Sequence, residues 1–380
     1  MLDDFFRTQL GSLAKENRLR QLPQSVHGID FCSNDYLGLA RTQQLFDDIQ
    51  EKVGALQFKQ NGATGSRLLS GNSNYTTDIE EKLSRIFNSE SSLIFNSGYS
   101  ANLAVLSSIP QRGDTIIYDE LAHTCIKDGA RLSLAHRHSF KHNDLADLER
   151  KLINSKGRKF IAIESIYSMD GDQCPLKEVV TLAKRYHAFI ILDEAHSTGI
   201  MGTKGSGMAS WLEIENQIDI RVYTFGKAMG IHGACVAGSS QLIQFLINYA
   251  RPFIYTTALP PHSMVAIECA FAFLEKNIHL QKKLSHKIDL FNKYTLGLRN
   301  KMMSHTSIQS VIIPGNDNVK KAAARLQARN FDVRPILSPT VATDSERIRI
   351  CLHTYNEDQH IIDLASQLIE LSLSSHSAMH

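Results

Sequence analysis

Short apolar runs that alternate with helical stretches constrain the fold of this chain more than any other feature. Between residues 41 and 280 these runs lie at 92–95, 115–118, 160–164, 188–192, 220–224 and 234–238. The run at 188–192 is continuously hydrophobic, which is typical of a strand buried on both faces. Strands separated by helices need crossover connections. The pattern therefore predicts an α/β fold on a mainly parallel sheet.

The two ends of the chain have a different order of elements. The patterns near the ends of the chain predict helices at 2–20, 319–329 and 357–373, and strands at 29–33, 310–313, 331–336 and 347–352, while a long helical pattern over 262–300 leads out of the central region. We therefore expect three parts: an N-terminal helix and strand segment over 1–40, a large domain over 41–280, and a small C-terminal α+β domain over 281–380.

Composition narrows the class of protein. Hydrophobic residues make up 43% of the 380 positions and the formal net charge is +2, so nothing in the charge balance favours nucleic acid or an anionic membrane as partner. No run approaches the roughly 20 apolar residues of a membrane helix. The six cysteines are scattered without a C-x-x-C pair, and Asp3 and Asp4 stand where a secretory signal carries bases. We expect a cytoplasmic protein without a cleaved signal.

Two strand ends carry an acid and a lysine that one ligand can bridge. Asp193 follows the 188–192 run, and Lys227 follows the 220–224 run. Ligands bind beyond the carboxyl ends of strands in open α/β sheets. A carboxylate can keep a pyridinium nitrogen protonated, and a lysine can form an imine with an aldehyde. Although a lone lysine is usually a surface charge, this placement predicts a pyridoxal phosphate site with Lys227 as the Schiff-base residue.

His196 follows Asp193 by three residues and can hydrogen-bond the phenolic oxygen of the same cofactor. Taken alone, an Asp-x-x-His is more often an N-cap acid beside a core histidine. Asp-Glu-Ala-His also occurs in nucleic-acid helicases, which need a phosphate loop of the form G-x-x-x-x-G-K-[ST]. The 62–67 stretch lacks that lysine and its spacing. We therefore reject the helicase and expect no nucleic-acid partner.

Other strand ends supply further candidates. Gly98 lies in a turn that opens a helix, whose N–H groups can hold a phosphate, and the Thr224 hydroxyl can join it. His123 follows the 115–118 run and can lie on the cofactor ring, while Ser168 follows the 160–164 run. Three further histidines, His136, His138 and His142, have no carboxylate or cysteine at ligand spacing, so we expect no metal.

Several motifs together resemble the α-oxoamine synthases, a family of fold-type I pyridoxal-phosphate enzymes. They lie at residues 33–39, 65–71, 193–199, 224–227 and 233–238. The resemblance covers nearly the whole chain and implies a transferase with a mainly parallel seven-stranded sheet and a smaller C-terminal α+β domain. The stretches 65–72, 338–341 and 347–353 are most similar to members that condense L-alanine with a pimeloyl thioester.

The resemblance also implies roles for residues of the cofactor site. Lys227 would form the Schiff base, His123 would stack on the ring, Asp193 would pair with the pyridinium nitrogen and His196 with the phenolic oxygen. The other residues implied to bind the cofactor are Gly98, Tyr99, Ser168 and Thr224, with Thr257 reaching the phosphate of a partner subunit. Such enzymes are usually homodimers.

The substrate residues are implied in the same way. Arg349, on the expected 347–352 strand, suits bidentate capture of a substrate carboxylate. The resemblance adds Asn34 and Thr340 to the substrate site and assigns Arg20 to the distal carboxylate of the acyl group, with Arg18 close enough to be the alternative. The implied reaction is decarboxylative condensation of L-alanine with a pimeloyl thioester on coenzyme A or acyl carrier protein.

Two rival functions remain open at this point. One is a sister synthase that uses glycine, serine or another acyl chain, including one that makes a signalling aminoketone. The other is a noncatalytic partner subunit, whose signature would be loss of the lysine, and Lys227 is present.

Overall fold

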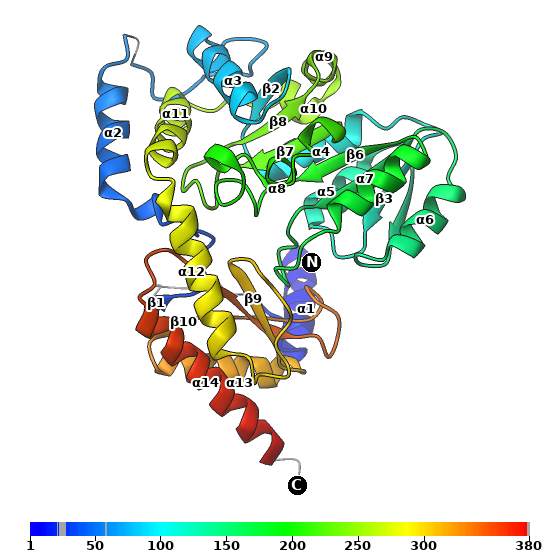
Figure 1. Cartoon of the computed structure of the whole chain (residues 1–380). Coiled ribbons are helices and arrows are strands. Elements are labelled where there is room, and N and C mark those ends of the chain that lie inside the picture. The colour runs from blue at the N-terminus through cyan, green and yellow to red at the C-terminus, as the bar shows by residue number, and fades with distance from the viewer. Residues whose placement is uncertain (21, 23–27, 58, 378–380) are drawn as a thin grey trace. The chain divides into compact units, whose positions relative to one another are not determined.

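The computed structural model describes residues 1–20, 22, 28–57 and 59–377 (Figure 1). These residues form two compact units. The large unit holds the described residues of 35–168 and 173–282, and the small unit holds those of 1–34, 169–172 and 283–377. The expected domain ranges 1–40, 41–280 and 281–380 stay a prediction.

The large unit is built on a seven-stranded sheet with the order β2-β8-β7-β6-β5-β3-β4. Its strands are β2 (Ser91–Phe95), β3 (Thr115–Asp119), β4 (His136–Phe140), β5 (Lys159–Glu164), β6 (Ala188–Asp193), β7 (Ile220–Thr224) and β8 (Ala234–Gly238). The strands β7, β6, β5, β3 and β4 lie side by side in that order, and each adjacent pair is parallel. Strand β8 is antiparallel to both β7 and β2. The expected α/β fold on a mainly parallel sheet is confirmed.

The sequence analysis missed the edge strand β4. Its five residues are His-Arg-His-Ser-Phe, and Phe140 is the only buried one among them. An edge strand that buries one side chain has no apolar run to reveal it.

Helices cover both faces of this sheet (Figure 1). The helices of the large unit are η1 (Leu39–Arg41), α2 (Gln43–Gly54), α3 (Asn74–Ile86), α4 (Gly98–Ser108), α5 (Thr124–Leu132), α6 (Leu145–Ile153), α7 (Leu176–Arg185), η2 (Thr203–Gly205), α8 (Met208–Trp211), η3 (Glu215–Gln217), α9 (Ser240–Tyr249), α10 (Arg251–Ile254) and α11 (Pro261–Lys276), and among them α2 packs on α11 rather than on the sheet. In β5, Phe160 and Ala162 join one apolar cluster while Ile161 and Ile163 join another. The strand is therefore buried on both faces, which explains its continuous apolar run.

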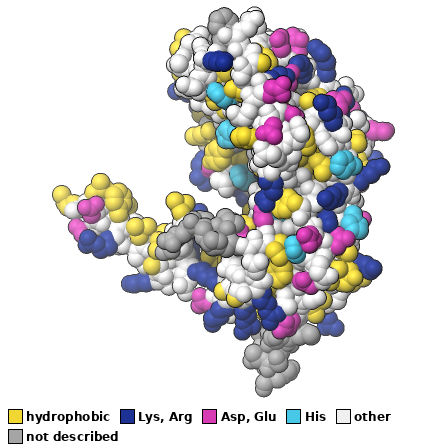
Figure 2. Space-filling view, turned by 90° about the vertical axis from the view of Figure 1, so that its left-hand side faces the viewer, with side chains coloured by type: hydrophobic (Ala, Val, Ile, Leu, Met, Phe, Trp, Pro, Cys, Tyr) yellow, Lys and Arg dark blue, Asp and Glu magenta, His cyan; other side chains and the backbone are white. Residues whose placement is uncertain are grey.

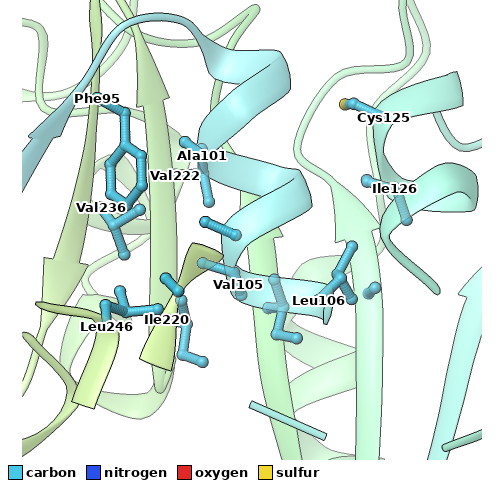
Figure 3. Packing of buried hydrophobic residues seen from close by; sticks show 14 of the residues in the cluster. Phe95, Ala101, Val105, Leu106, Cys125, Ile126, Ile220, Val222, Val236 and Leu246 are labelled. Atoms are coloured by element: carbon cyan, nitrogen blue, oxygen red, sulfur yellow. The ribbon is translucent and has the colours of Figure 1, made fainter. Parts of the chain in front are cut away.

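The first cluster fixes α4, which begins at the candidate site. Figure 3 shows Ala101 and Val105 of this helix against the strands that carry Val222 and Val236, with α5 and its Ile126 on the other side. All five side chains are buried. Burial on this scale holds the start of α4 against the carboxyl end of β7.

The small unit contains two short sheets. Its elements are α1 (Leu2–Lys15), β1 (Ile29–Asp30), α12 (His279–Tyr294, which starts in the large unit), β9 (Ile308–Ile312), α13 (Asn316–Ala328), β10 (Phe331–Asp332), β11 (Arg334–Ile336), β12 (Arg347–Cys351) and α14 (Asp358–Ser377). Strands β11, β12 and β9 form an antiparallel sheet, and β1 pairs with β10 in parallel.

Several element bounds from the sequence analysis are wrong, and the strand expected at 29–33 is only Ile29–Asp30. The first helix ends at Lys15 rather than residue 20. The 262–300 pattern contains two helices, because Asn277 leaves the helical conformation at φ −120° and ψ 38°. The 331–336 run contributes β10 and β11 to different sheets, with Val333 between them. Apolar periodicity alone does not mark such breaks, since the buried face continues across them.

None of the helices formed by the described residues combines the length and the apolar character that a bilayer crossing requires.

Candidate functional site

The carboxyl ends of three neighbouring strands carry the central side chains of the large unit. Asp193 ends β6 and is paired in register with Glu164 at the end of β5. Thr224 ends β7, and Lys227 follows three residues later. The expectation that strand ends would bring an acid and a lysine to one edge of the sheet agrees with this topology.

Lys227 and His196 are in direct contact. The distance from Lys227 Nζ to His196 Nε2 is 2.9 Å, and the other ring nitrogen, Nδ1, lies 2.8 Å from the Tyr36 hydroxyl. The imidazole therefore bridges an amine and a phenol, and one tautomer must serve both bonds. A lysine held by a buried histidine has a defined position for its amine.

The turn that carries Lys227 is packed tightly against the segment that carries Tyr36. The Gly230 N–H donates to the Lys227 carbonyl oxygen at 2.8 Å. Gly230 has φ +67°, and a Cβ there would clash with the backbone of Leu39 and Ala40. This close approach requires glycine, so the turn after Lys227 lies directly against the segment that follows Tyr36.

Asp193 is buried, with an exposed fraction of 5%. Its Oδ2 accepts a hydrogen bond from Asn102 Nδ2 at 2.6 Å, and its Oδ1 accepts one from the Ala195 N–H at 2.8 Å. Two donors fix the orientation of the carboxylate, which is what an acid that must face a ring nitrogen needs. Asn102 stands on the second turn of α4.

Two buried glutamates hold the loops around Asp193. Glu164 accepts the His123 N–H, and burial, together with the negative charge of Asp193, raises the pKa of Glu164 to about 8. Glu194 accepts the N–H groups of Met208 at 3.0 Å and Ala209 at 2.8 Å, and burial raises its pKa as well. The Glu194 bonds fix the turn that presents His196.

His123 is the N-cap residue of α5, and its own Nδ1 accepts the Cys125 N–H. Partial burial of the ring lowers the pKa of His123, and the charge of Lys227 lowers it further. The ring of Tyr99 packs edge-on against it, with 6.5 Å between ring centroids. Tyr99 is itself 45% exposed, and its hydroxyl donates to Asp128.

The start of α4 lies against Thr224. Gly98 is the first residue of this helix, and a Cβ on Gly98 would clash with Thr224 Oγ1. Ser97 and Ser100 close a capping box at the same turn. The structure thus brings together two of the predicted cofactor residues, at a helix N-terminus suited to an anion.

Two other predicted cofactor residues lie in loops. Ser168 is buried in the loop after β5. Thr257 precedes α11, and its carbonyl oxygen accepts a hydrogen bond from Asn96 Nδ2 at 2.8 Å. Thr257 thus contacts the residue just before the Ser97 cap within the same chain. Its role toward a partner subunit stays a prediction.

The predicted substrate residues form two pairs in the small unit. Arg349 Nη2 donates to Asn34 Oδ1 at 2.9 Å. Arg20 Nη2 and Thr340 Oγ1 are 3.4 Å apart. The alternative to Arg20, Arg18, instead binds Glu16 with 2.5 Å between Nη1 and Oε2. Arg349 is thus in contact with Asn34, and Arg20 lies beside Thr340. The roles of these four residues in substrate binding stay a prediction.

Asn34 owes its position to a polar turn. Asp30 Oδ1 accepts the N–H groups of Cys32 and Ser33, each at 2.9 Å. Burial alone would raise the pKa of Asp30, but these bonds and the nearby His353 hold it below its usual range. The Tyr355 hydroxyl donates to Asp30 Oδ2 at 2.8 Å, so the turn before Asn34 is fixed to the segment after β12.

Sequence reasoning missed four residues of the site. Tyr36, Asn102, Cys125 and Glu164 hold His196, Asp193 and His123 in place. Asn102 had a usable signal, because it lies one turn after Gly98 on the helix that opens at the strand end. Tyr36 lies within the 33–39 motif, but nothing in that motif indicated its contact with His196, which is 160 residues away. The described part of the chain holds no cluster of three or more metal-binding side chains.

Comparisons with known proteins agree with this geometry. The family model of aminotransferase class I and II matches residues 26–364. An 8-amino-7-oxononanoate synthase of Emericella nidulans is 38% identical over 369 residues, covering 90% of this chain and 89% of that protein.

Two solved structures share the fold. A crystal structure of 8-amino-7-oxononanoate synthase from Francisella tularensis is 27% identical, with a TM-score of 0.79 over 94% of this chain and 100% of that one. A Sphingomonas wittichii serine palmitoyltransferase is 24% identical, with a TM-score of 0.86 over 99% and 98% of the two chains, and this likeness concerns the fold alone. The chain belongs to the aminotransferase class I and II family and, within it, to the α-oxoamine synthases.

Proposed function

We propose that this chain is a pyridoxal phosphate-dependent enzyme that condenses L-alanine with a pimeloyl thioester. The products are 8-amino-7-oxononanoate, carbon dioxide and the free thiol of coenzyme A or acyl carrier protein. The observation that carries the proposal is the placement of Lys227, His196 and Asp193 at neighbouring strand ends. The 8-amino-7-oxononanoate synthase of Emericella nidulans, whose match covers 90% of this chain, supports the same reaction by its name.

The residues present fit pyridoxal phosphate. The buried Asp193 carboxylate, fixed by two donors, suits a protonated ring nitrogen. The start of α4, where Gly98 lies against Thr224, is a helix N-terminus, which suits a phosphate. This cofactor requires an amine that can form an imine, an acid that can accept from its ring nitrogen and N–H groups that can hold its phosphate. Lys227, Asp193 and the start of α4 at Gly98 would supply these groups.

When bound, the cofactor supplies an electron-accepting ring that stabilises negative charge beside the substrate amine. The chain supplies the proton transfers. Lys227 Nζ would take the proton from the alanine Cα, and His196 Nε2, at 2.9 Å, would keep the amine oriented. Tyr36 in turn holds His196, and Asn102 holds Asp193.

The small unit would recognise the substrates. Arg349, held by Asn34, would bind the alanine carboxylate until it leaves as carbon dioxide. Arg20, beside Thr340, would bind the distal carboxylate of the pimeloyl chain. In the large unit, His123 would donate a hydrogen bond to the carbonyl oxygen of the thioester.

We also propose a cytoplasmic homodimer. The described residues include all six cysteines, and none forms a disulfide, as in a reducing compartment. Apolar side chains of α1 are exposed in the single chain, with exposed fractions of 66% for Leu2, 57% for Phe5 and 52% for Leu10. Figure 2 shows hydrophobic side chains at the surface among charged ones. Burial of such side chains favours a second copy as partner.

The test is a matrix of amino acids and thioesters. The holoenzyme is assayed with L-alanine, glycine or L-serine against pimeloyl, acetyl and palmitoyl thioesters, and the aminoketone is identified by mass. We expect the highest kcat/KM for L-alanine with the pimeloyl thioester and none in Lys227→Ala. A higher kcat/KM for glycine or serine would assign the chain to a sister synthase, and no turnover with any pair would favour a noncatalytic subunit.

A further inference from the structure

We infer that Cys125 and the first turn of α5 hold the His123 imidazole in the tautomer that carries its proton on Nε2, which makes Cys125 a positioning residue. The inference rests on the proposed function, because it concerns the histidine that would face the acyl substrate. It deepens that function by assigning which atom of His123 donates.

The first observation is the backbone geometry. His123 stands at the N-cap of α5, where a side-chain oxygen of Ser, Thr, Asp or Asn usually accepts an orphan N–H. Here the acceptor is a ring nitrogen: the Cys125 N–H donates to His123 Nδ1 at 3.2 Å. A nitrogen that accepts an N–H presents its lone pair, so Nδ1 carries no proton.

The second observation is the thiol of the same residue. Cys125 Sγ lies 2.9 Å from His123 Nδ1. Burial raises the pKa of the Cys125 thiol, and the negative charges of Asp193 and Glu164 raise it further. The thiol therefore keeps its proton and shares Nδ1 with the backbone donor. Both donors come from one residue and act on one nitrogen.

The charge of the ring follows from its surroundings. Burial lowers the pKa of His123, Lys227 and Lys127 lower it further, and Asp193 and Asp128 oppose them. A neutral imidazole has one proton. Because Nδ1 is the acceptor of both Cys125 donors, that proton is on Nε2.

The packing of α5 keeps Cys125 in place. Figure 3 shows Cys125 one residue before Ile126, on the helix that lies beside α4. A Cβ added to Gly129 of α5 would be 2.7 Å from Leu106 Cβ of α4, so the two helices approach closely. Both Cys125 and Ile126 are buried. The donors are therefore presented by a rigid element rather than by a loop.

As a consequence, the His123 imidazole has a neutral N–H donor, Nε2–H, on the side of the ring that faces away from Cys125. Nε2–H can donate to the carbonyl oxygen of the thioester, where negative charge develops during attack, without supplying a full positive charge. If the protonated nitrogen were Nδ1, the same edge of the ring would present a lone pair and would repel that oxygen. Cys125 thus determines whether His123 helps or hinders the condensation.

The test combines nuclear magnetic resonance with kinetics on the holoenzyme. Histidine labelled with ¹⁵N reports the tautomer directly, and His123→Gln assigns the signal by its loss. The variants are Cys125→Ala, which removes the thiol donor, and Cys125→Ser, which restores a donor. Cys269→Ala, another buried helical cysteine, is the matched control. The thermal unfolding midpoint of each variant shows that it folds.

We expect wild type to show an unprotonated Nδ1 and a protonated Nε2. Cys125→Ala keeps the backbone donor but loses the thiol donor, so part of the protein should adopt the Nδ1-protonated tautomer. The acidic limb of the kcat/KM profile should then move to higher pH, and kcat should fall about two- to tenfold, as loss of one modest hydrogen bond would. Cys125→Ser should restore the wild-type tautomer, pH profile and kcat, and Cys269→Ala should change none of these three.

A wild-type signal with the proton on Nδ1 would overturn the inference. So would a Cys125→Ala protein whose His123 signal and pH profile match wild type. The tautomer is read without turnover, so failure of the condensation assay would count against the proposed function and leave this result intact.

Discussion

Lys227 Nζ lies 2.9 Å from Nε2 of His196, and the Tyr36 hydroxyl lies 2.8 Å from Nδ1 on the opposite side of the same ring. The position of the amine therefore depends on a phenol near the start of the chain. A lysine that must both bind an aldehyde and move a proton needs this kind of fixed neighbour.

Tyr36→Phe tests that dependence. Loss of the bond to Nδ1 should cost about 0.5–1.5 kcal/mol of unfolding free energy, and His196 should no longer hold the amine as well, so that kcat falls about three- to tenfold. Urea unfolding and steady-state kinetics measure the two effects. Tyr249→Phe, at an exposed tyrosine, is the control. Equal kcat in wild type and Tyr36→Phe would remove the proposed role of the phenol.

Gly98→Ala tests the start of α4 as the phosphate site. The new methyl group would clash with Thr224 Oγ1, so the helix start must shift. Overpacking of this kind costs about 1–3 kcal/mol, and we expect the Kd for pyridoxal phosphate to rise by about five- to 100-fold. Equilibrium dialysis measures this Kd.

A second glycine-to-alanine variant serves as the control, because it distinguishes the effect of the clash from a general effect of replacing glycine by alanine. Gly54→Ala adds a methyl group where nothing lies within 4 Å and should leave the Kd unchanged. The double variant Gly98→Ala/Thr224→Ala relieves the clash and should recover the fold, but not the hydroxyl contact. Unchanged cofactor affinity in Gly98→Ala would place the phosphate elsewhere.

Glu164→Gln tests the buried carboxyl beside Asp193. Because burial raises the pKa of Glu164 from 4.5 to about 8, its protonated form stabilises the fold, and this contribution is present below pH 4.5 and lost as pH rises through about 8. Glutamine stays neutral and can still accept the His123 N–H through its carbonyl oxygen.

We therefore expect wild type to lose more unfolding free energy than Glu164→Gln between about pH 5 and pH 9, by at least about 1 kcal/mol. Denaturant unfolding of the cofactor-free proteins at both pH values measures the difference. Parallel pH dependence in the two proteins would mean that Glu164 titrates normally in the fold.

Arg349→Lys tests the carboxylate site of the small unit. Lysine keeps the charge but loses the fork that suits a carboxylate, so KM for L-alanine should rise about tenfold or more while cofactor binding stays the same. The control is Arg334→Lys, at the position paired with Arg349 across β11 and β12, whose arginine binds Asp332 at 2.9 Å. A rise in KM for the thioester alone would assign Arg349 to the acyl chain.

Much of the fold could be predicted because its strands are buried on both faces. Runs such as 160–163 and 188–192 are apolar throughout, and the acids that follow them, Glu164 and Asp193, stand out as polar. The exposed edge strand β4 and the break at Asn277 had no such contrast.

The site was predictable to the same extent. Asp193 ends a strand and Lys227 and His196 lie shortly after strands, so their positions in the sequence already indicated the edge of the sheet where they lie. Tyr36 reaches His196 from 160 residues away, and the Cys125 contacts depend on the side chain of an N-cap histidine. Contacts of this kind come from tertiary packing, which periodicity does not encode.

The most direct test of the account is to find where pyridoxal phosphate is attached. The holoenzyme is reduced with borohydride, digested, and its peptides are sequenced by mass spectrometry. The account predicts a reduced adduct on the Lys227 side chain, with none in Lys227→Ala. An adduct on another lysine, or no adduct in wild type that has bound the cofactor, would contradict it.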